Sequence, residues 1–158
     1  MSSLRPQTRM LSEQATAVRR AVLVPDHLSD WVPQACAEVA TYLHRRGIAP
    51  AGYPFARCHS LLDNLIEVEA GIPVAAPIVG SRAVGPSTLP AGPAVVVWHT
   101  DPHEKIGLAQ QAIDDWLQSE PADRTGDSWE VYHDLPTCDQ VGVRIEVIQP
   151  IVFAAATV

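Results

Sequence analysis

The sequence predicts an α+β fold of two tandem β-α-β-β repeats, related by a pseudo-twofold axis, with antiparallel sheets, two helices and a central ligand cleft. Three observations predict it: the order strand, helix, strand, strand occurs twice in 158 residues, a segment rich in proline and glycine separates the two copies, and similar residues recur at a fixed distance. One such repeat has a single helix for two sheet faces. Two repeats would therefore bury their remaining apolar faces jointly and leave a cleft where they meet.

The first repeat is predicted over residues 15–74, after a polar, aperiodic segment (residues 1–14) that we expect to be a flexible tail. An apolar, partly alternating run predicts its first strand, and apolar residues at helical spacing predict the helix. The expected elements are a strand at Ala15–Val24, a helix at Asp30–Arg46, and strands at about Tyr53–Ser60 and Asn64–Ile72.

Residues 75–92 are expected to be a linker, because proline withholds a backbone donor from a strand ladder and glycine tolerates unusual dihedral angles. The second repeat is predicted over residues 93–158. Its first strand is an unbroken apolar run, so we expect both of its faces to be covered. The expected elements are a strand at Ala94–His99, a helix that starts at Asp101-Pro102-His103-Glu104 and runs to about Leu117, and strands at about Ser128–His133 and Gly142–Pro150.

Residue matches support a duplication. A shift of 74 positions places Phe55 on Trp129 and His59 on His133. The last strand needs a shift of about 79 positions, which places Ile66-Glu67-Val68 on Ile145-Glu146-Val147. The recurrence of both the element order and these residues is hard to obtain by chance.

Composition narrows the class of protein. Hydrophobic residues make up 47% of the chain and charged residues 18%, which is typical of a packed globular protein. The formal net charge of −7 repels phosphate backbones, so no direct nucleic-acid binding is expected. No segment predicts a signal peptide or a membrane span. Three widely spaced cysteines do not predict a disulfide framework or a zinc ribbon, and reduced thiols in a cytoplasmic protein are the expectation.

The segment Trp129-Glu130-Val131-Tyr132-His133 carries the chemistry of greatest interest. Strand alternation places Glu130 and Tyr132 on one face. The first repeat has the smaller Ala56 and Cys58 at the corresponding positions, so a carboxylate and a phenol would face a smaller wall across the cleft. A glutamate withdrawn from water has a raised pKa or takes a cationic or donating partner. The alternative is a solvated strand residue, or one paired with a nearby arginine.

Other residues allow two interpretations. Glu67 and Glu146 share a repeat position, which favours a structural bond to a loop backbone, with ligand binding by Glu146 as the alternative. Trp98 ends a central strand, where an aromatic face beside a carboxylate would suit flat, apolar and often cationic molecules, or would simply be core. His99 and His103 flank a strand-to-helix turn and would not share a helix face. We expect no metal and no cofactor, because motifs for zinc, P-loop and dinucleotide sites are missing from the sequence.

Several motifs together resemble a known family, the GyrI-like small-molecule-binding domain, which is also the effector-binding half of many AraC-type and MerR-type multidrug regulators. The resemblance covers about Ala15 to Phe153. Asp101, His103 and Cys58 depart from the glycine and tyrosines of the family pattern. The matching segments are Leu89-Pro90-Ala91-Gly92, Val95 to Gly107, Trp129-Glu130-Val131-Tyr132, Arg144 to Ile151, Gly52 to His59 and Val68 to Val74.

The resemblance implies two fused SH2-like units and gives Glu130 the role of the buried acid that meets cationic or polarised ligands. Too few residues precede the first strand for a helix-turn-helix domain, so we expect a free-standing binding domain, not a whole transcription regulator. The candidate ligand-binding residues are Glu130, Tyr132, Trp98, Ala56, Cys58, Phe55 and Glu146.

Three functions are compatible with this resemblance. The first is binding of apolar, aromatic or cationic small molecules. The second is hydrolysis of cyclopropanoid genotoxic natural products, with catalytic Glu130 as base or proton relay and catalytic Tyr132 orienting the leaving phenolate. The third is a protein-interaction role with a DNA topoisomerase, like the gyrase inhibitors that name the family. The sequence identifies neither the natural ligand nor the oligomeric state.

Overall fold

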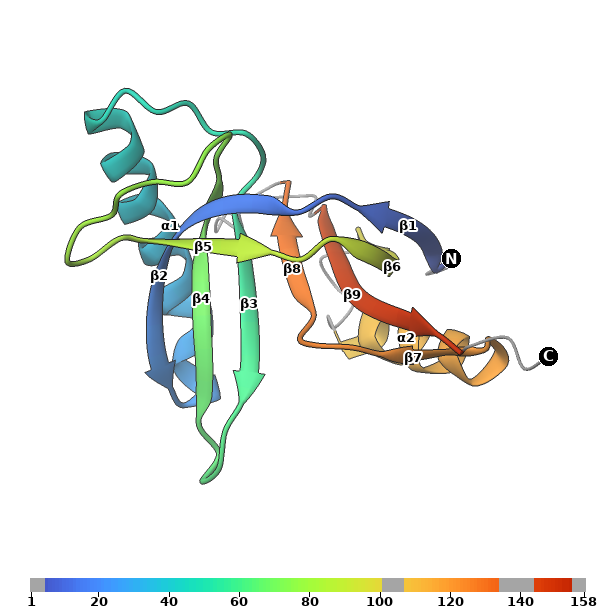
Figure 1. Cartoon of the computed structure of the whole chain (residues 1–158). Helices are drawn as coiled ribbons and strands as arrows, with labels where there is room; N and C mark the ends of the chain where they lie inside the picture. The colour runs from blue at the N-terminus through green and yellow to red at the C-terminus, as the bar shows by residue number, and fades with distance from the viewer. Residues whose placement is uncertain (1–4, 101–106, 134–143, 155–158) are drawn as a thin grey trace. The chain divides into compact units, whose positions relative to one another are not determined.

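The computed structural model describes residues 5–100, 107–133 and 144–154 (Figure 1). The chain divides into two compact units. We call Glu13–Pro90 the N-unit, and Met1–Ser12 together with Ala91–Val158 the C-unit. Within the described ranges, two α-helices and antiparallel strands form the structure, which confirms the predicted α+β class.

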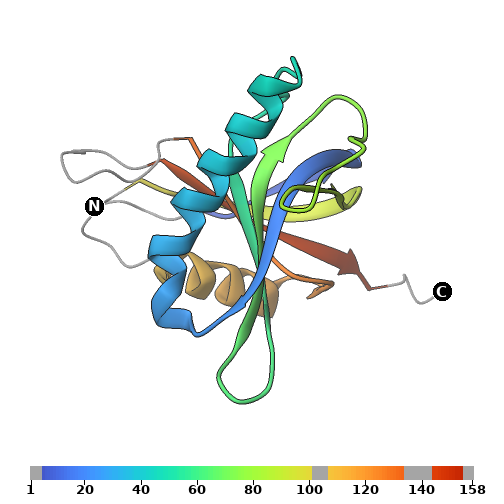
Figure 2. The ribbon, with the colours of Figure 1, turned by 90° about the vertical axis from the view of Figure 1, so that its left-hand side faces the viewer.

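The N-unit contains an antiparallel sheet in the order β3-β4-β2-β5, with the long helix α1 against one of its faces (Figure 2). Val39 and Leu43 of α1 pack on Ala17 of β2 and Ile72 of β4, and all four side chains are buried. This contact uses the apolar stripe that the helical spacing predicted. The elements are β2 (Gln14–Leu23), a 3₁₀ turn (Pro25–His27), α1 (Leu28–Arg45), β3 (Phe55–Ser60), β4 (Ile66–Pro73) and β5 (Gly85–Leu89).

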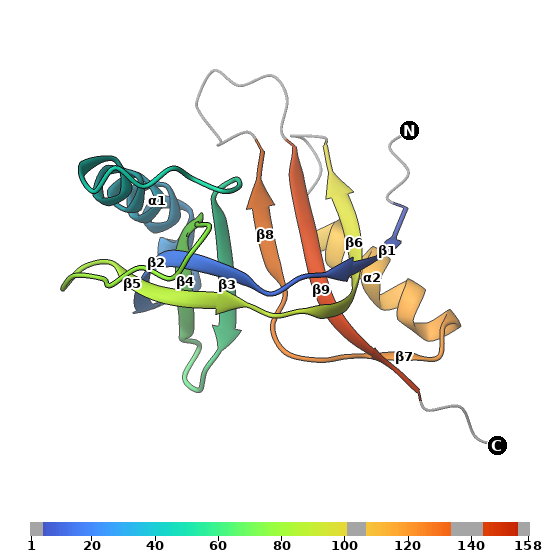
Figure 3. The same ribbon diagram turned by 45° about the horizontal axis from the view of Figure 1, so that its top comes forward.

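The C-unit has the strand order β1-β6-β9-β8, and β7 pairs with the far end of β9 (Figure 3). Ala109 and Ile113 of α2 pack on Val95, Val97 and Val147 of the sheet. The apolar run of β6 is buried from Ala94 to Val97, as its sequence predicted. The elements are β1 (Gln7–Leu11), β6 (Gly92–His99), α2 (Gly107–Ser119), β7 (Ala122–Arg124), β8 (Trp129–Tyr132) and β9 (Ile145–Phe153). The predicted helix start at Asp101 to Glu104 lies outside the described residues.

Two segments without a strand signal in the sequence are strands. Gln7–Leu11, within the expected flexible tail, forms β1 and pairs with β6. Gly85–Leu89, within the expected linker, forms β5 and pairs with β2. Both strands end their unit's sheet, and their side chains are mostly exposed or half-buried, so backbone pairing holds them without an apolar pattern.

The strand register revises the alignment of the two repeats. Phe55 lies opposite Gly71 and Trp129 lies opposite Ile148. With Phe55 aligned on Trp129, the counterpart of Glu146 is therefore Glu69, and the match of Glu67 to Glu146 was wrong by two residues. Because side chains alternate with a period of two, this slip leaves the glutamate on the same face.

Among the described residues, no helix combines the length and the apolar character that a membrane span requires.

Candidate functional site

Glu130 and Tyr132 lie on β8, on the face of the C-unit sheet that α2 covers. Their cross-strand neighbours on β9 are Val147 and Ile145. Directly opposed residues in an antiparallel pair project from the same face, and both neighbours belong to the apolar cluster under α2. The predicted pairing of the carboxylate and the phenol on one face is thus seen in the strand register.

Glu130 is a half-buried carboxyl group in apolar surroundings. Among residues 5–100, 107–133 and 144–154 it has no hydrogen bond and no ion pair. Burial raises the pKa of Glu130 above its ordinary value, because the charged form loses water without gaining a partner. Such a group can hold a proton at a pH where an exposed glutamate is ionised, or accept a cation from outside the chain.

Tyr132 supplies an aromatic surface on the same face. Its half-buried ring packs against the cluster that Val147 and Ile145 help to form. A phenol ring beside a carboxylate attracts organic cations through both its apolar area and its π-face.

Trp98 and Glu146 form a different group on the opposite face of this sheet. They are cross-strand neighbours in β6 and β9. Arg9 places a guanidinium nitrogen 2.8 Å from one carboxylate oxygen of Glu146, and His133 Nε2 lies 2.5 Å from the other. The His133 ring is tilted against Trp98, with ring centroids 4.8 Å apart. Glu146 is only 7% exposed, and these contacts are with side chains, in place of the expected bond to a loop backbone.

The candidate residues of the first repeat also divide between two faces. Ala56 and Cys58 of β3 lie opposite Ala70 and Val68, on the face that α1 covers. Ala56 is buried and Cys58 is half-buried. Phe55 is fully buried and projects from the other face. Ala56 and Cys58 thus occupy the helix-covered face of their unit, as Glu130 and Tyr132 do in theirs.

A cluster around Glu69 was missed by sequence reasoning. Its carboxylate contacts Arg57 at 2.5 Å and Arg20 at 3.2 Å, and the Ser87 hydroxyl donates to it. Strand alternation tells which residues of β3 share a face with Arg57 and which residues of β4 share a face with Glu69. It does not tell that Arg57 lies opposite Glu69, which depends on the register of β3 on β4. Arg9 of β1 is a partner of Glu146. It lies in the segment that we expected to be a flexible tail, so nothing in the sequence indicated this contact.

Among the described residues, no three histidine, cysteine, aspartate or glutamate side chains lie close enough together to hold a metal ion.

Comparisons with known proteins agree with this architecture. A sequence model of the GyrI-like small molecule binding domain matches residues 6–148. No curated protein sequence matches the chain significantly. The C-terminal domain of EcmrR has the same fold, with a TM-score of 0.79, 16% identity, and coverage of 96% of this chain and 99% of that domain. In an EcmrR–DNA complex the match spans 58% of the EcmrR chain.

Two further solved structures share the fold at lower similarity. A hydrolase from Listeria innocua aligns with a TM-score of 0.67 and 12% identity, over 96% of this chain and 94% of that one. SAV2435 bound to tetraphenylphosphonium aligns with a TM-score of 0.58 and 12% identity, over 94% of both chains.

Proposed function

We propose that this chain, which belongs to the family of GyrI-like small-molecule-binding domains, binds lipophilic organic cations and uses Glu130 as their counter-ion. The observation that carries the proposal is a half-buried carboxylate without a polar partner among the described residues. A cation that reaches Glu130 would recover the electrostatic energy that burial costs the carboxylate.

The other buried carboxylates are less suited to this role. Glu146 already contacts Arg9 and His133, and Glu69 already contacts two arginines. A ligand cation at either position would have to displace a cation of the protein. Within the described ranges, Glu130 is the one of these three without a compensating charge, and Tyr132 adds an aromatic surface on the same face. The tetraphenylphosphonium complex of SAV2435, a protein of the same fold, supports this class of ligand.

Calorimetric titration with tetraphenylphosphonium tests the proposal. Glu130→Gln keeps the shape of the side chain and removes its charge, so we expect binding to weaken by about tenfold or more. Glu67→Gln is the matched control, because it makes the same change at an exposed position of β4 and should leave the affinity unchanged. Triphenylphosphine oxide, a neutral analogue, should bind both variants alike. Equal affinity of the wild-type chain and Glu130→Gln for tetraphenylphosphonium would overturn the proposal.

The pH dependence gives an independent test. Since burial raises the pKa of Glu130, the carboxylate needed by the cation forms at a higher pH than for an exposed glutamate. Affinity for tetraphenylphosphonium should therefore rise with pH through that raised pKa in the wild-type chain. It should stay flat over the same range in Glu130→Gln.

A second candidate function, hydrolysis of a strained ring, is favoured by the same raised pKa and by the fold shared with the Listeria hydrolase. Here ionised Glu130 would take a proton from a water whose oxygen bonds to a cyclopropane carbon. The broken carbon–carbon bond would leave its electron pair on a phenolate oriented by Tyr132. Mass spectrometry of a cyclopropanoid substrate should then show addition of one water by the wild-type chain and none by Glu130→Gln. Unchanged substrate with the wild-type chain would reject hydrolysis and leave the binding proposal in place.

A further inference from the structure

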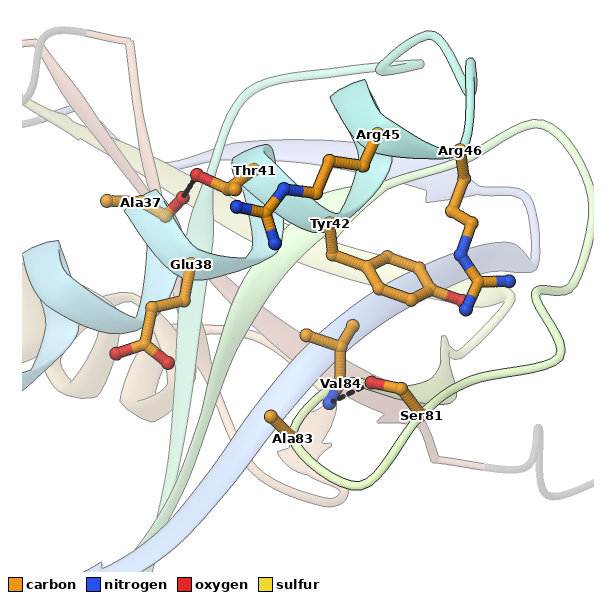
Figure 4. A pocket seen from close by; sticks show the side chains of 9 residues that line it. All are labelled: Ala37, Glu38, Thr41, Tyr42, Arg45, Arg46, Ser81, Ala83 and Val84. Atoms are coloured by element: carbon orange, nitrogen blue, oxygen red, sulfur yellow. Dashed lines mark hydrogen bonds between the residues drawn. The ribbon is translucent and has the colours of Figure 1, made fainter.

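A pocket in the N-unit combines an apolar floor with two arginines. It lies along the C-terminal half of α1, and Ser81, Ala83 and Val84 form the opposite wall (Figure 4). Its volume is about 460 Å³, which is within the range of small-molecule sites. All of its lining residues belong to the N-unit, so its geometry is that of one compact body.

The charge of the pocket is positive on a chain whose net charge is −7. The side chains of Arg45 and Arg46 line it, and within the described ranges neither has a carboxylate partner or a side-chain hydrogen bond. The one acidic lining residue, Glu38, has its carboxylate 2.5 Å from Arg19 and is thereby neutralised. Two guanidinium groups thus remain available to an anion.

The floor of the pocket suits a flat aromatic group. Val84 is 3% exposed and the Tyr42 ring is half-buried against the same core cluster. The guanidinium carbon of Arg46 lies 5.1 Å from the centre of the Tyr42 ring, so a cation–π contact holds this arginine beside the floor. Figure 4 shows the ring and Val84 between the helix and the loop, with Arg46 alongside the ring.

The wall opposite the helix is a closed loop. The Ser81 N–H donates to the Val84 carbonyl at 2.7 Å, and the Val84 N–H donates to the Ser81 hydroxyl at 3.3 Å. On the helix side, the Thr41 hydroxyl donates to the Ala37 carbonyl at 3.1 Å. These bonds engage the Ser81 and Thr41 hydroxyls within the walls, and Arg45 and Arg46 are the cationic side chains that can select a ligand by its charge.

We propose that this pocket binds planar aromatic carboxylates, with the ring on Tyr42 and Val84 and the carboxylate between Arg45 and Arg46. The site thus takes anions, whereas the function proposed for Glu130 requires cations. The two proposals rest on different residues and can fail independently.

The test is an NMR titration of the ¹⁵N-labelled chain with 2-naphthoate and, separately, with its neutral amide 2-naphthamide. We expect saturable shifts of the Tyr42 and Val84 backbone amides with 2-naphthoate. Binding of the amide should be weaker by about tenfold, the value of one or two charge-assisted hydrogen bonds. Equal affinity for both compounds, or shifts that do not saturate at these amides, would overturn the proposal.

Three variants assign the binding to these residues. The double variant Arg45→Gln, Arg46→Gln should reduce 2-naphthoate affinity to that of the amide, and Ala83→Phe should block both compounds by filling the pocket. Arg82→Gln is the matched control, because Arg82 is an exposed residue of the same loop that does not line the pocket. All the changed side chains are exposed, so the folded spectrum should persist outside the site. Unchanged affinity in the double variant would reject the role of the arginines.

Discussion

The two units carry a buried glutamate at equivalent positions but surround it with different partners. Glu69 of the N-unit and Glu146 of the C-unit occupy equivalent register positions, and both are less than 10% exposed. Glu69 is held by two arginines and a serine hydroxyl, whereas Glu146 is held by one arginine and a histidine. Both units therefore retain a buried acid on the face away from the helix and supply it with compensating groups.

On the helix-covered faces, one unit has a glutamate and the other has none at the equivalent position. The C-unit has Glu130 there without a partner among the described residues, and the N-unit has Ala56 at the equivalent position. Carboxylates that support a fold are paired, while an isolated one raises the free energy of the folded state. The comparison thus separates the structural glutamates from the functional candidate.

The largest expected loss of stability comes from adding a side chain at Gly71, the N-unit position that corresponds to Ile148 of the C-unit. A Cβ at Gly71 would lie 1.9 Å from the backbone carbonyl oxygen of Ala17, so the N-unit cannot accept a side chain where the C-unit has one. Gly71→Ala should lower the free energy of unfolding by about 4 kcal/mol or more, because backbone must move. Urea denaturation measures it. Gly85→Ala, where a Cβ would have open space, should cost less than about 1 kcal/mol. An unchanged midpoint for Gly71→Ala would contradict the close approach of β2 and β4.

The next effect compares the two buried acids. Glu69→Gln leaves two permanent cations without their shared carboxylate and should cost about 2 kcal/mol. Glu146→Gln should cost less, about 1 kcal/mol, because Glu146 has a single arginine partner, Arg9, whose side chain is 41% exposed to water. Urea denaturation of both variants at pH 7.5 gives the two values. Equal losses would show that the number of arginine partners does not distinguish the two buried acids.

A smaller effect, of opposite sign, is expected for Glu130→Gln. The folded-state pKa of Glu130 is raised, so its contribution to stability is most favourable at low pH. This contribution falls as pH rises from the unfolded-state pKa to the folded-state pKa. At neutral pH the variant should be more stable by on the order of 1 kcal/mol, and this difference should disappear near pH 4. A variant less stable than the wild-type chain at neutral pH would indicate that Glu130 is compensated.

The smallest effect is chemical and concerns the two cysteines of the N-unit. Cys36 lies on the buried face of α1, and this burial raises the pKa of its thiol to about 11, whereas Cys58 of β3 is half-buried. Because the thiolate is the reactive form, iodoacetamide at pH 8 should modify Cys36 about 100-fold more slowly than an ordinary thiol. Peptide mapping over time should show Cys58 alkylated first. Faster labelling of Cys36 would indicate local opening of α1.

Elements with an apolar pattern were predictable from the sequence, and those held by backbone pairing were not. The stripe of α1 and the run of β6 were identified because burial selects side-chain type at a fixed period. Most side chains of the edge strands β1 and β5 are exposed or half-buried, so these segments show no periodic apolar pattern in the sequence. Alternation was sufficient to place Glu130 with Tyr132. The partners of Glu69 and Glu146 depended on register, which alternation does not specify.

The pairing of β1 with β6 determines what a truncated chain would expose. A fragment of residues 13–90 keeps every strand of its own sheet, since β5 comes with it. A fragment that starts at residue 91 loses Gln7–Leu11 and bares the outer N–H and C=O groups of β6 along a strongly apolar strand. Such an edge recruits strands from other molecules, so this fragment should self-associate, and a synthetic peptide of the β1 sequence should suppress the association.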